Sequence, residues 1–326
     1  MNKKTNRLTI LLAAVSVVLC VAVMGTGMAL AQNAGEDLVE SLAKETPTAP
    51  AKQAERRMIV VTKPYTVPSE AISPQLAVSI GEEVVEKAFG KTLETRILVS
   101  YELNLSENRQ LWSVQAETLD CYVSFDVDAL SGAFVSCRDE ADFVEEWRSQ
   151  FDSITQEKEN AKRAKDEDRI RIAERWQDQL DGKEEVYSQE TLDAWAAETE
   201  YKLNDIKAAI ETNKDSAFAA TATDWVNERS AVFFNGAKAV RAVVLGNGNE
   251  WSEDEQEPEK VKRVSDDGEE SYVLIGPPQF VISEVQLDNG TYVNLHINRK
   301  TGAAVFYQPL GTTSLTEYWY GVKLDR

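Results

Sequence analysis

The chain has 326 residues, of which 43% are hydrophobic, and its formal net charge at neutral pH is −20. This hydrophobic content excludes a wholly disordered chain, and the length suits two modest domains with accessory segments. The negative charge excludes a nucleic-acid-binding surface, because such a surface needs clustered lysine and arginine. It also excludes a folded part that lies flat on an anionic lipid surface.

The N-terminus carries the clearest localisation signal. Three basic residues stand among the first seven, and an uncharged run then extends to residue 31. This pattern predicts an uncleaved transmembrane anchor or a signal peptide over residues 1–31, in which Ala29 and Ala31 form a small-x-small cleavage site. The length of the run favours the anchor. In both cases the rest of the chain is expected outside the cytoplasm, on a single-pass membrane protein or secreted after cleavage.

A polar tether and a first α+β domain follow. Residues 32–57 are polar and contain two prolines, which is typical of a tether. In residues 58–138 a helix is predicted with Ser73 as its N-cap, Pro74 in its first turn and Gly90 just past its end. Alternating strand patterns stand on both sides of this helix. The domain is therefore predicted as a helix with an antiparallel sheet.

Residues 139–212 are predicted as an α-helical hairpin. Aromatic residues recur every four positions from Phe143 to Phe151, and apolar residues continue at helical spacing as far as residue 210. The pair Asp181-Gly182 interrupts this pattern and divides it into two helices. The aromatic stripe is interpreted as intramolecular packing, with a docking face as the alternative.

The second domain is predicted over residues 213–326. Its helix carries an apolar stripe from Phe218 to Val226, with Asp215 or Ser216 as its cap, and strand patterns follow. An acidic insert, residues 246–271, separates the first of these strands from the others. It is interpreted as a solvated loop, with a partner- or cation-binding loop as the alternative.

The two domains share a repeated strand–turn–strand motif, "YVSFDVDALSGAFVSC" from residue 122 and "YVNLHINRKTGAAVFY" from residue 292. Five of the 16 aligned positions are identical, which indicates an internal duplication. Both turns combine an Asp or Asn with a Ser or Thr and a Gly, the residues that tight turns favour. The turn residues are Asp128, Ser131 and Gly132 in the first copy and Asn298, Thr301 and Gly302 in the second. A structural role within its own turn is expected for Asp128, with partner contact as the alternative.

A helix followed by an antiparallel meander that closes on this motif resembles the PepSY domain family. In the first copy Tyr122, Val127, Asp128, Ala129, Ser131 and Gly132 match the family's last hairpin. The second copy keeps Tyr292, Ile297, Thr301 and Gly302 but has Asn298 and Arg299 in place of the acid and the alanine. Its long insert is a further departure from the family's compact form. The two matches together cover roughly half of the chain.

The resemblance implies small α+β modules that lie outside bacterial cells, often behind a signal peptide or a single membrane helix. Such modules are associated with the restraint or regulation of peptidases and with protein–protein contacts at the cell envelope. Tandem copies on an anchor are also similar to the extracytoplasmic parts of Gram-positive sporulation and cell-wall regulators. The expected fold class is thus α+β, with two PepSY-like domains separated by a helical hairpin behind an N-terminal membrane or signal helix.

Two cysteines, Cys121 and Cys137, lie on the two arms of the first repeated hairpin. An oxidising compartment makes a disulfide between them plausible. The alternative is a pair of separate buried thiols, because the turn register can place the two residues out of alignment. The sequence leaves both open.

Catalytic, metal and cofactor sites are not indicated. The single histidine, His296, aligns with Asp126 and is expected on the solvated face of its strand. No nucleophile-elbow, Walker or dinucleotide-binding glycine motif is present, and the acidic insert lacks the spacing of an EF-hand loop. We therefore expect no catalytic residue, no cofactor and no bound metal.

These observations predict a non-enzymatic extracytoplasmic protein-binding or regulatory module. Its expected partner is another envelope protein, a peptidase or a membrane regulator, and exposed sheet edges are the candidate surface. The alternatives are a cell-envelope hydrolase that uses carboxylates which the sequence does not identify, and a structural spacer.

Overall fold

The computed structural model describes residues 56–104, 109–183, 187–213, 216–246, 252, 256–264 and 270–324. The predicted anchor or signal peptide, Ala29, Ala31, nearly all of the tether, Asp215 and much of the acidic insert lie outside these residues. Within the described part, no helix is both long and apolar enough to cross a membrane. The chain has a mixed α+β fold in two compact units, one of residues 1–192 with 311–326 and one of residues 193–310.

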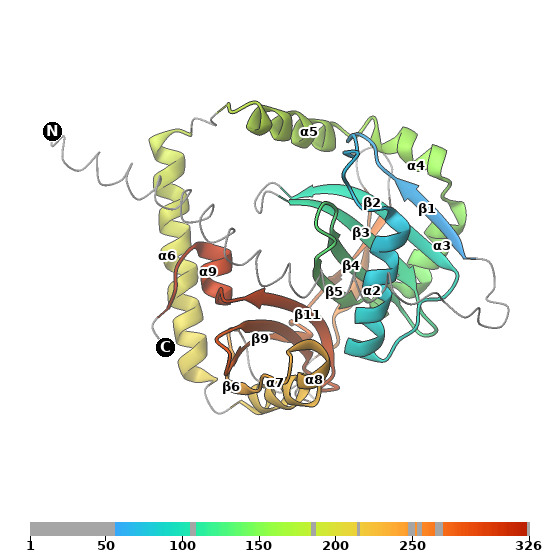
Figure 1. Ribbon diagram of the computed structural model, residues 1–326. Coiled ribbons are helices and arrows are strands. Elements are labelled where there is room, and N and C mark those ends of the chain that lie inside the picture. The colour runs from blue at the N-terminus through green and yellow to red at the C-terminus, as the bar shows by residue number, and fades with distance from the viewer. Residues whose placement is uncertain are drawn as a thin grey trace, which may run out of the picture. The chain divides into compact units, whose positions relative to one another are not determined.

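The strands of the first unit pair side by side in a sheet (Figure 1). Its strands are β1 (Arg57–Val61), β2 (Arg96–Asn104), β3 (Arg109–Glu117), β4 (Tyr122–Asp128) and β5 (Phe134–Asp139), in that spatial order. β1 runs parallel to β2, and the later strands form an antiparallel meander.

Helix α2 (Pro74–Phe89) covers one face of this sheet. The Ser73 side chain accepts the Leu76 N–H, Pro74 opens the first turn, and Gly90 ends the helix in the left-handed conformation, so the predicted caps are confirmed. At Gly81 the helix packs tightly against the sheet, because an added Cβ would lie 1.9 Å from the Phe125 ring. Glycine is therefore required there for close packing.

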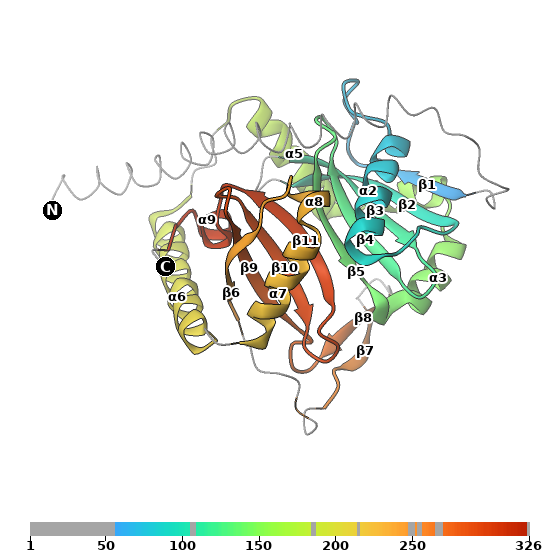
Figure 2. The same cartoon turned by 60° about the horizontal axis from the view of Figure 1, so that its bottom comes forward.

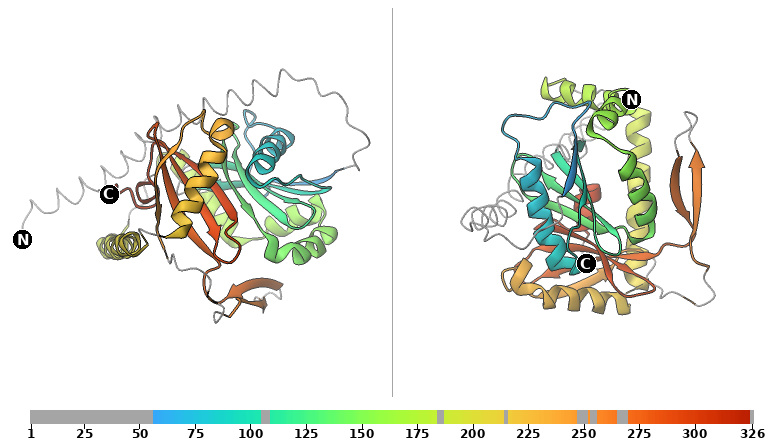
Figure 3. Two further views of the ribbon diagram at one scale, coloured as in Figure 1. Left: turned by 90° about the horizontal axis from the view of Figure 1, so that it is seen from below. Right: turned by 90° about the vertical axis from the view of Figure 1, so that its right-hand side faces the viewer.

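The predicted helical hairpin contains four helices rather than two. They are α3 (Val144–Ser153), α4 (Gln156–Arg163), α5 (Glu167–Leu180) and α6 (Gln189–Thr212), preceded by the short 3₁₀ helix η1 (Ala141–Phe143). Thr155 and Asp166 each accept a backbone N–H at the start of a new helix, which explains the extra boundaries. Trp147 and Phe151 on α3 pack with Ile59 and Val61 of β1. The second face of the first sheet is thus covered by the segment that follows it in the chain (Figure 3).

The second unit repeats the helix and the four-stranded meander (Figure 2). Helix α7 (Ala217–Glu228) begins at Ser216, whose side chain accepts the Phe218 N–H, and it is followed by the single turn α8 (Ser230–Phe233). The strands lie in the order β6 (Ala239–Val244), β9 (Phe280–Leu287), β10 (Tyr292–Asn298) and β11 (Ala304–Gly311). All four predicted stripe residues of α7 are buried: Phe218, Ala222, Trp225 and Val226.

The acidic insert was expected to be a loop, and in part it is a β-hairpin. Strands β7 (Glu259–Val264) and β8 (Glu270–Ile275) pair antiparallel as a separate two-stranded sheet. The sequence "EKVKRV" has only two apolar residues, three positions apart, so it lacks the period-two alternation that predicts a strand. The chain ends in the short helix α9 (Leu315–Tyr320), which Ser314 caps.

Candidate functional site

The repeat turn of the first unit is organised by one carboxylate oxygen. Asp128 Oδ1 accepts the backbone N–H groups of Leu130 and Ser131 at 3.1 and 2.8 Å, and the Ser131 hydroxyl at 2.8 Å. The Ser131 Oγ in turn accepts the Ala133 N–H at 3.2 Å, and Gly132 has a φ of 73°. The carboxylate therefore has the structural role expected for it, since its bonds lie within its own turn.

The second copy builds the same turn with an amide. Asn298 Oδ1 accepts the Lys300 and Thr301 N–H groups at 2.9 and 3.0 Å, and Thr301 Oγ1 accepts the Ala303 N–H at 3.2 Å. Gly302 has a φ of 70°. The substitution of Asn for Asp thus leaves the turn unchanged, because the bonds need only an acceptor oxygen.

Cys121 and Cys137 are both buried, and the structure holds them as thiols. In the pairing of β4 with β5, Cys137 lies opposite Phe125, four residues beyond Cys121. Four residues of strand span about 13 Å, whereas a disulfide joins Cα atoms that lie roughly 5.5 Å apart. The register therefore favours two separate thiols.

Polar neighbours surround Cys121 without activating it. Lys91 Nζ lies 3.0 Å from the Cys121 sulfur and 2.6 Å from Asp139 Oδ2, and the Thr118 hydroxyl lies 2.9 Å from the sulfur. Burial raises the pKa of the Cys121 thiol to about 11, although the bonds from Lys91 and Thr118 act to lower it. For Lys91, burial acts to lower the pKa, but the bonds to Asp139 and Cys121 raise it above its ordinary value. At neutral pH the pair is therefore a thiol beside an ammonium group, which is not a poised nucleophile.

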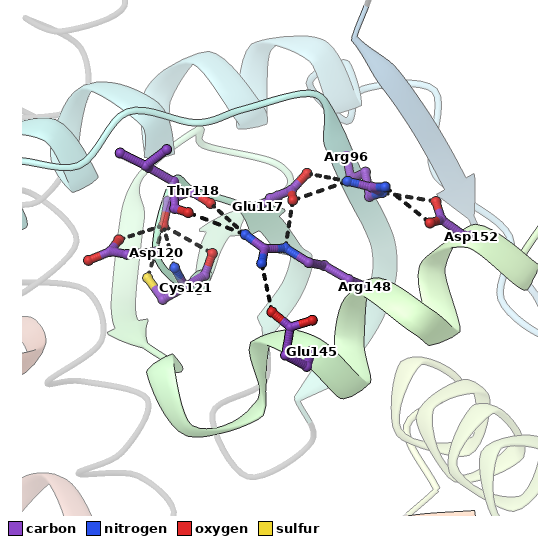
Figure 4. Close-up of polar contacts among 9 residues, drawn as sticks. Arg96, Glu117, Thr118, Asp120, Cys121, Glu145, Arg148 and Asp152 are labelled. Atoms are coloured by element: carbon purple, nitrogen blue, oxygen red, sulfur yellow. Dashed lines mark hydrogen bonds and ion pairs between the residues drawn. The ribbon is translucent and has the colours of Figure 1, made fainter.

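Next to this thiol, a buried carboxylate joins the sheet to α3 (Figure 4). Glu117 is 6% exposed, accepts two bonds from Arg96 at 3.1 and 2.9 Å, and accepts one from Arg148 at 2.8 Å. Arg96 also donates to Asp152 at 2.9 and 3.0 Å, and this lowers the pKa of the Asp152 carboxyl. A carboxylate that accepts charge-assisted bonds from two guanidinium groups, one on the sheet and one on α3, is suited to structural bridging.

A second carboxylate joins β2 to α4 and α5. Glu102 accepts bonds from Arg163 at 2.6 Å and from Arg169 at 2.7 Å, one to each carboxylate oxygen. Arg163 is itself 9% exposed. Ion pairs thus hold α4 and α5 to β2, whereas α3 also packs on the sheet through its aromatic side chains.

His296 does not lie on a solvated face, contrary to expectation. It is 7% exposed and lies between Phe280 on β9 and Phe306 on β11, with ring centroids 4.8 and 4.3 Å away. The alternating sequence pattern of β10 did not predict this burial, because the burial of the sheet face on which His296 lies depends on side chains from the neighbouring strands. His296 is a core residue of its unit.

The chemistry available in the described ranges is limited. They contain no cluster of three or more His, Cys, Asp or Glu residues that could hold a metal ion. The charged groups described above hold one another in ion pairs, and none of them places a nucleophile beside a base. The aromatic residues divide between two roles: Trp147, Phe151 and Trp176 are buried, whereas Trp195 on α6 is 47% exposed.

Comparison with known proteins leaves the family open. No protein-family model and no curated protein matches the chain. A solved structure described as "Bacillus megaterium YpeB C-terminal domain" aligns over 74% of this chain and 98% of that chain, with 9% sequence identity and a TM-score of 0.21. A TM-score this low supports no conclusion about fold or function.

Proposed function

We propose that the chain is a non-enzymatic extracytoplasmic protein made of two PepSY-like domains, and that it binds and regulates another envelope protein. The observation that carries this proposal is the duplicated unit of one helix and a four-stranded meander, in which the side-chain oxygens of both turns accept the corresponding backbone N–H groups. The described charged residues form ion pairs that suit a scaffold, which favours binding over catalysis.

The edge strand β6 is the proposed binding surface. It lies at one end of its sheet and pairs with β9. Leu245 donates its N–H to the Ile282 carbonyl of β9 at 2.9 Å. Because successive N–H groups of a strand point to opposite sides, the Val243 N–H also points to β9, whereas the Ala242 N–H points to the outer edge. A bulge at Val240 limits the regular part of the strand to Arg241–Val244. An extended segment of a partner protein can add here as a further strand.

Strand β1, at the edge of the first sheet, is less suitable as a surface for a partner strand. Asn160 of α4 accepts the N–H groups of Thr62 and Lys63 just beyond β1, at 3.0 and 3.2 Å. Arg57 at the start of β1 donates to the Ile154 carbonyl at 2.8 Å. Because the covering helices hold both ends of β1, a partner strand would have to displace them.

The partner is proposed to be a peptidase or a membrane-bound regulator of the cell envelope. The export of the chain rests on the basic end and uncharged run of residues 1–31, and the protein is proposed to stay in the cell membrane on that helix. Intact mass of the purified protein distinguishes this anchored form from one cleaved after Ala31.

The proposal is tested by cross-linking the tagged full-length protein in cells and identifying the captured proteins by mass spectrometry. We expect one dominant envelope protein with the wild-type chain. Ala242→Pro removes the outward N–H and is expected to abolish the capture, whereas Ala242→Val keeps that N–H and should retain it.

Two results would contradict the proposal. Capture of cell-wall background alone would leave the hydrolase and the spacer as the competing functions. Equal capture by the proline and valine variants would exclude the β6 edge. Thermal unfolding of both variants checks that each is folded.

A further inference from the structure

The β7–β8 hairpin stands out because it is a sheet of only two strands. Figure 3 shows it standing apart from the other strands of its own unit. Five of the six β7 residues are exposed, and Ile275 on β8 is 51% exposed. A lone two-stranded ribbon is only marginally stable in water, and stability usually requires a third strand.

The base of the hairpin is firmly held. An added Cβ at Gly276 would lie 2.8 Å from the Pro258 Cα, so the two ends of the hairpin meet there in close backbone contact. Lys300, in the repeat turn, forms an ion pair with Glu257, and the neighbouring Arg299 donates its N–H to the Gln279 carbonyl at 2.7 Å. The ribbon is therefore presented in a defined direction from the turn of the second repeat.

The two strands differ in the partners that their outer edges allow. β7 carries Lys260, Lys262 and Arg263. If β7 paired antiparallel with β7 of a second copy about a two-fold axis, every register that pairs five or more residues would set two cations opposite each other. Such pairs are destabilising. From Ser271 to Ile275, by contrast, β8 carries no charge, and Tyr272, Val273 and Leu274 are half-exposed. The β8 edge is thus the one that accepts an identical strand.

We propose that the β8 edge pairs antiparallel with β8 of a second copy of this chain, so that two hairpins form one four-stranded sheet. A two-fold axis at Val273 sets Val273 of each copy opposite Val273 of the other and Tyr272 opposite Leu274, so every residue from Ser271 to Ile275 faces an uncharged residue. Apolar side chains that face each other across two strands form favourable cross-strand pairs. The contact is closed by symmetry and leaves the charged β7 strands outside, where lysines protect an edge from further growth.

This self-association is independent of partner binding at β6. It is tested with two differently tagged full-length copies expressed together, one of which is captured while the other is detected. We expect wild-type copies to capture each other. Val273→Lys sets two lysines opposite each other and should reduce the capture at least about tenfold.

A charge-swapped pair separates a lost contact from a misfolded hairpin. A copy with Val273→Lys should capture a copy with Val273→Glu, because the lysine then faces the glutamate. The matched control, Lys260→Gln with Lys262→Gln on β7, should leave the wild-type capture unchanged. When Cys20, the third cysteine of the sequence, is replaced by serine, two Val273→Cys copies should form a disulfide with each other.

The proposal is overturned if wild-type copies do not capture each other. It is also overturned if capture survives Val273→Lys, since the copies would then associate elsewhere. A disulfide that links a Val273→Cys copy to a different protein and not to a second Val273→Cys copy would show that β8 serves another partner.

Discussion

The side-chain oxygens of Asp128 and Asn298, 170 positions apart in the chain, accept the same two backbone N–H groups of their turns. In both turns the backbone N–H of this residue also donates to the carbonyl five positions on, at 2.8 Å in each case. The two copies have therefore kept the hydrogen bonds of the turn while the charge of its first residue changed.

The turn predicts how substitutions at its first position act. Asp128→Ala and Asn298→Ala should each lower the free energy of unfolding by about 1–2 kcal/mol, because two backbone donors lose their acceptor. Asp128→Asn should have little effect, since the second copy makes the same bonds with an amide. Chemical denaturation of the three variants measures this, and equal losses for Asp128→Ala and Asp128→Asn would show that the charge itself matters.

The contact between Gly81 and Phe125 predicts a second effect. Alanine normally favours a helix over glycine by about 1 kcal/mol. Here the added Cβ would lie 1.9 Å from the Phe125 ring, so Gly81→Ala should destabilise the protein by about 1–3 kcal/mol.

A second substitution tests the cause of that loss. Phe125→Leu makes room for the new methyl group, so the double variant should lose less than the sum of the two single variants. Ser79→Ala, on an exposed position of the same helix, serves as the control and should change stability by less than about 0.5 kcal/mol. Strict additivity in the double-mutant cycle would refute the steric explanation.

Glu140 predicts a pH dependence. Burial raises the pKa of its carboxyl above the ordinary value, against the opposing effects of Arg138 and of the Ser124 hydroxyl that lies 3.2 Å away. A raised pKa in the folded state means that stability is fully present below the unfolded-state pKa and is lost as pH rises through the folded-state pKa.

Glu140→Gln removes that loss and should raise the unfolding temperature at pH 7. The difference from wild type should shrink as pH falls to about 4, where the carboxyl of the unfolded chain also becomes protonated. Thermal unfolding across this pH range measures the effect, with Glu174→Gln on the exposed side of α5 as the control. A difference that does not vary with pH would contradict the assignment.

Cys121 predicts slow thiol chemistry in the folded protein. With a pKa of about 11, only about one thiol in a thousand is ionised at pH 8, and the side chain is fully buried. In a Cys20→Ser background, a disulfide-exchange reagent should therefore react with Cys121 slowly in the native chain.

Unfolding without reductant should release two thiols per chain, from Cys121 and Cys137. Release of none would establish the disulfide that the strand register disfavours. A Ser69→Cys variant provides an exposed thiol that should react at once in the native state.

The features that the sequence determined by itself are those that depend on residues a few positions apart. Ser73 and Gly90 bound α2, and the two repeat turns form, because each cap or turn bond joins groups that lie within about five residues of each other. The apolar stripe of α7 was predictable for the same reason, since helical spacing alone sets which side chains share a face.

Only the tertiary structure decided the features that depend on which strands lie side by side. His296 is buried because Phe280 and Phe306 lie on the neighbouring strands, and Cys121 is offset from Cys137 because the pairing of β4 with β5 sets Phe125 opposite the second cysteine. Glu102 and Glu117 bind arginines 31 or more positions further along the chain, a separation at which sequence spacing carries no geometric information. Local hydrogen bonding thus determined the elements and their repeat, whereas strand pairing and long-range charge determined what each element covers.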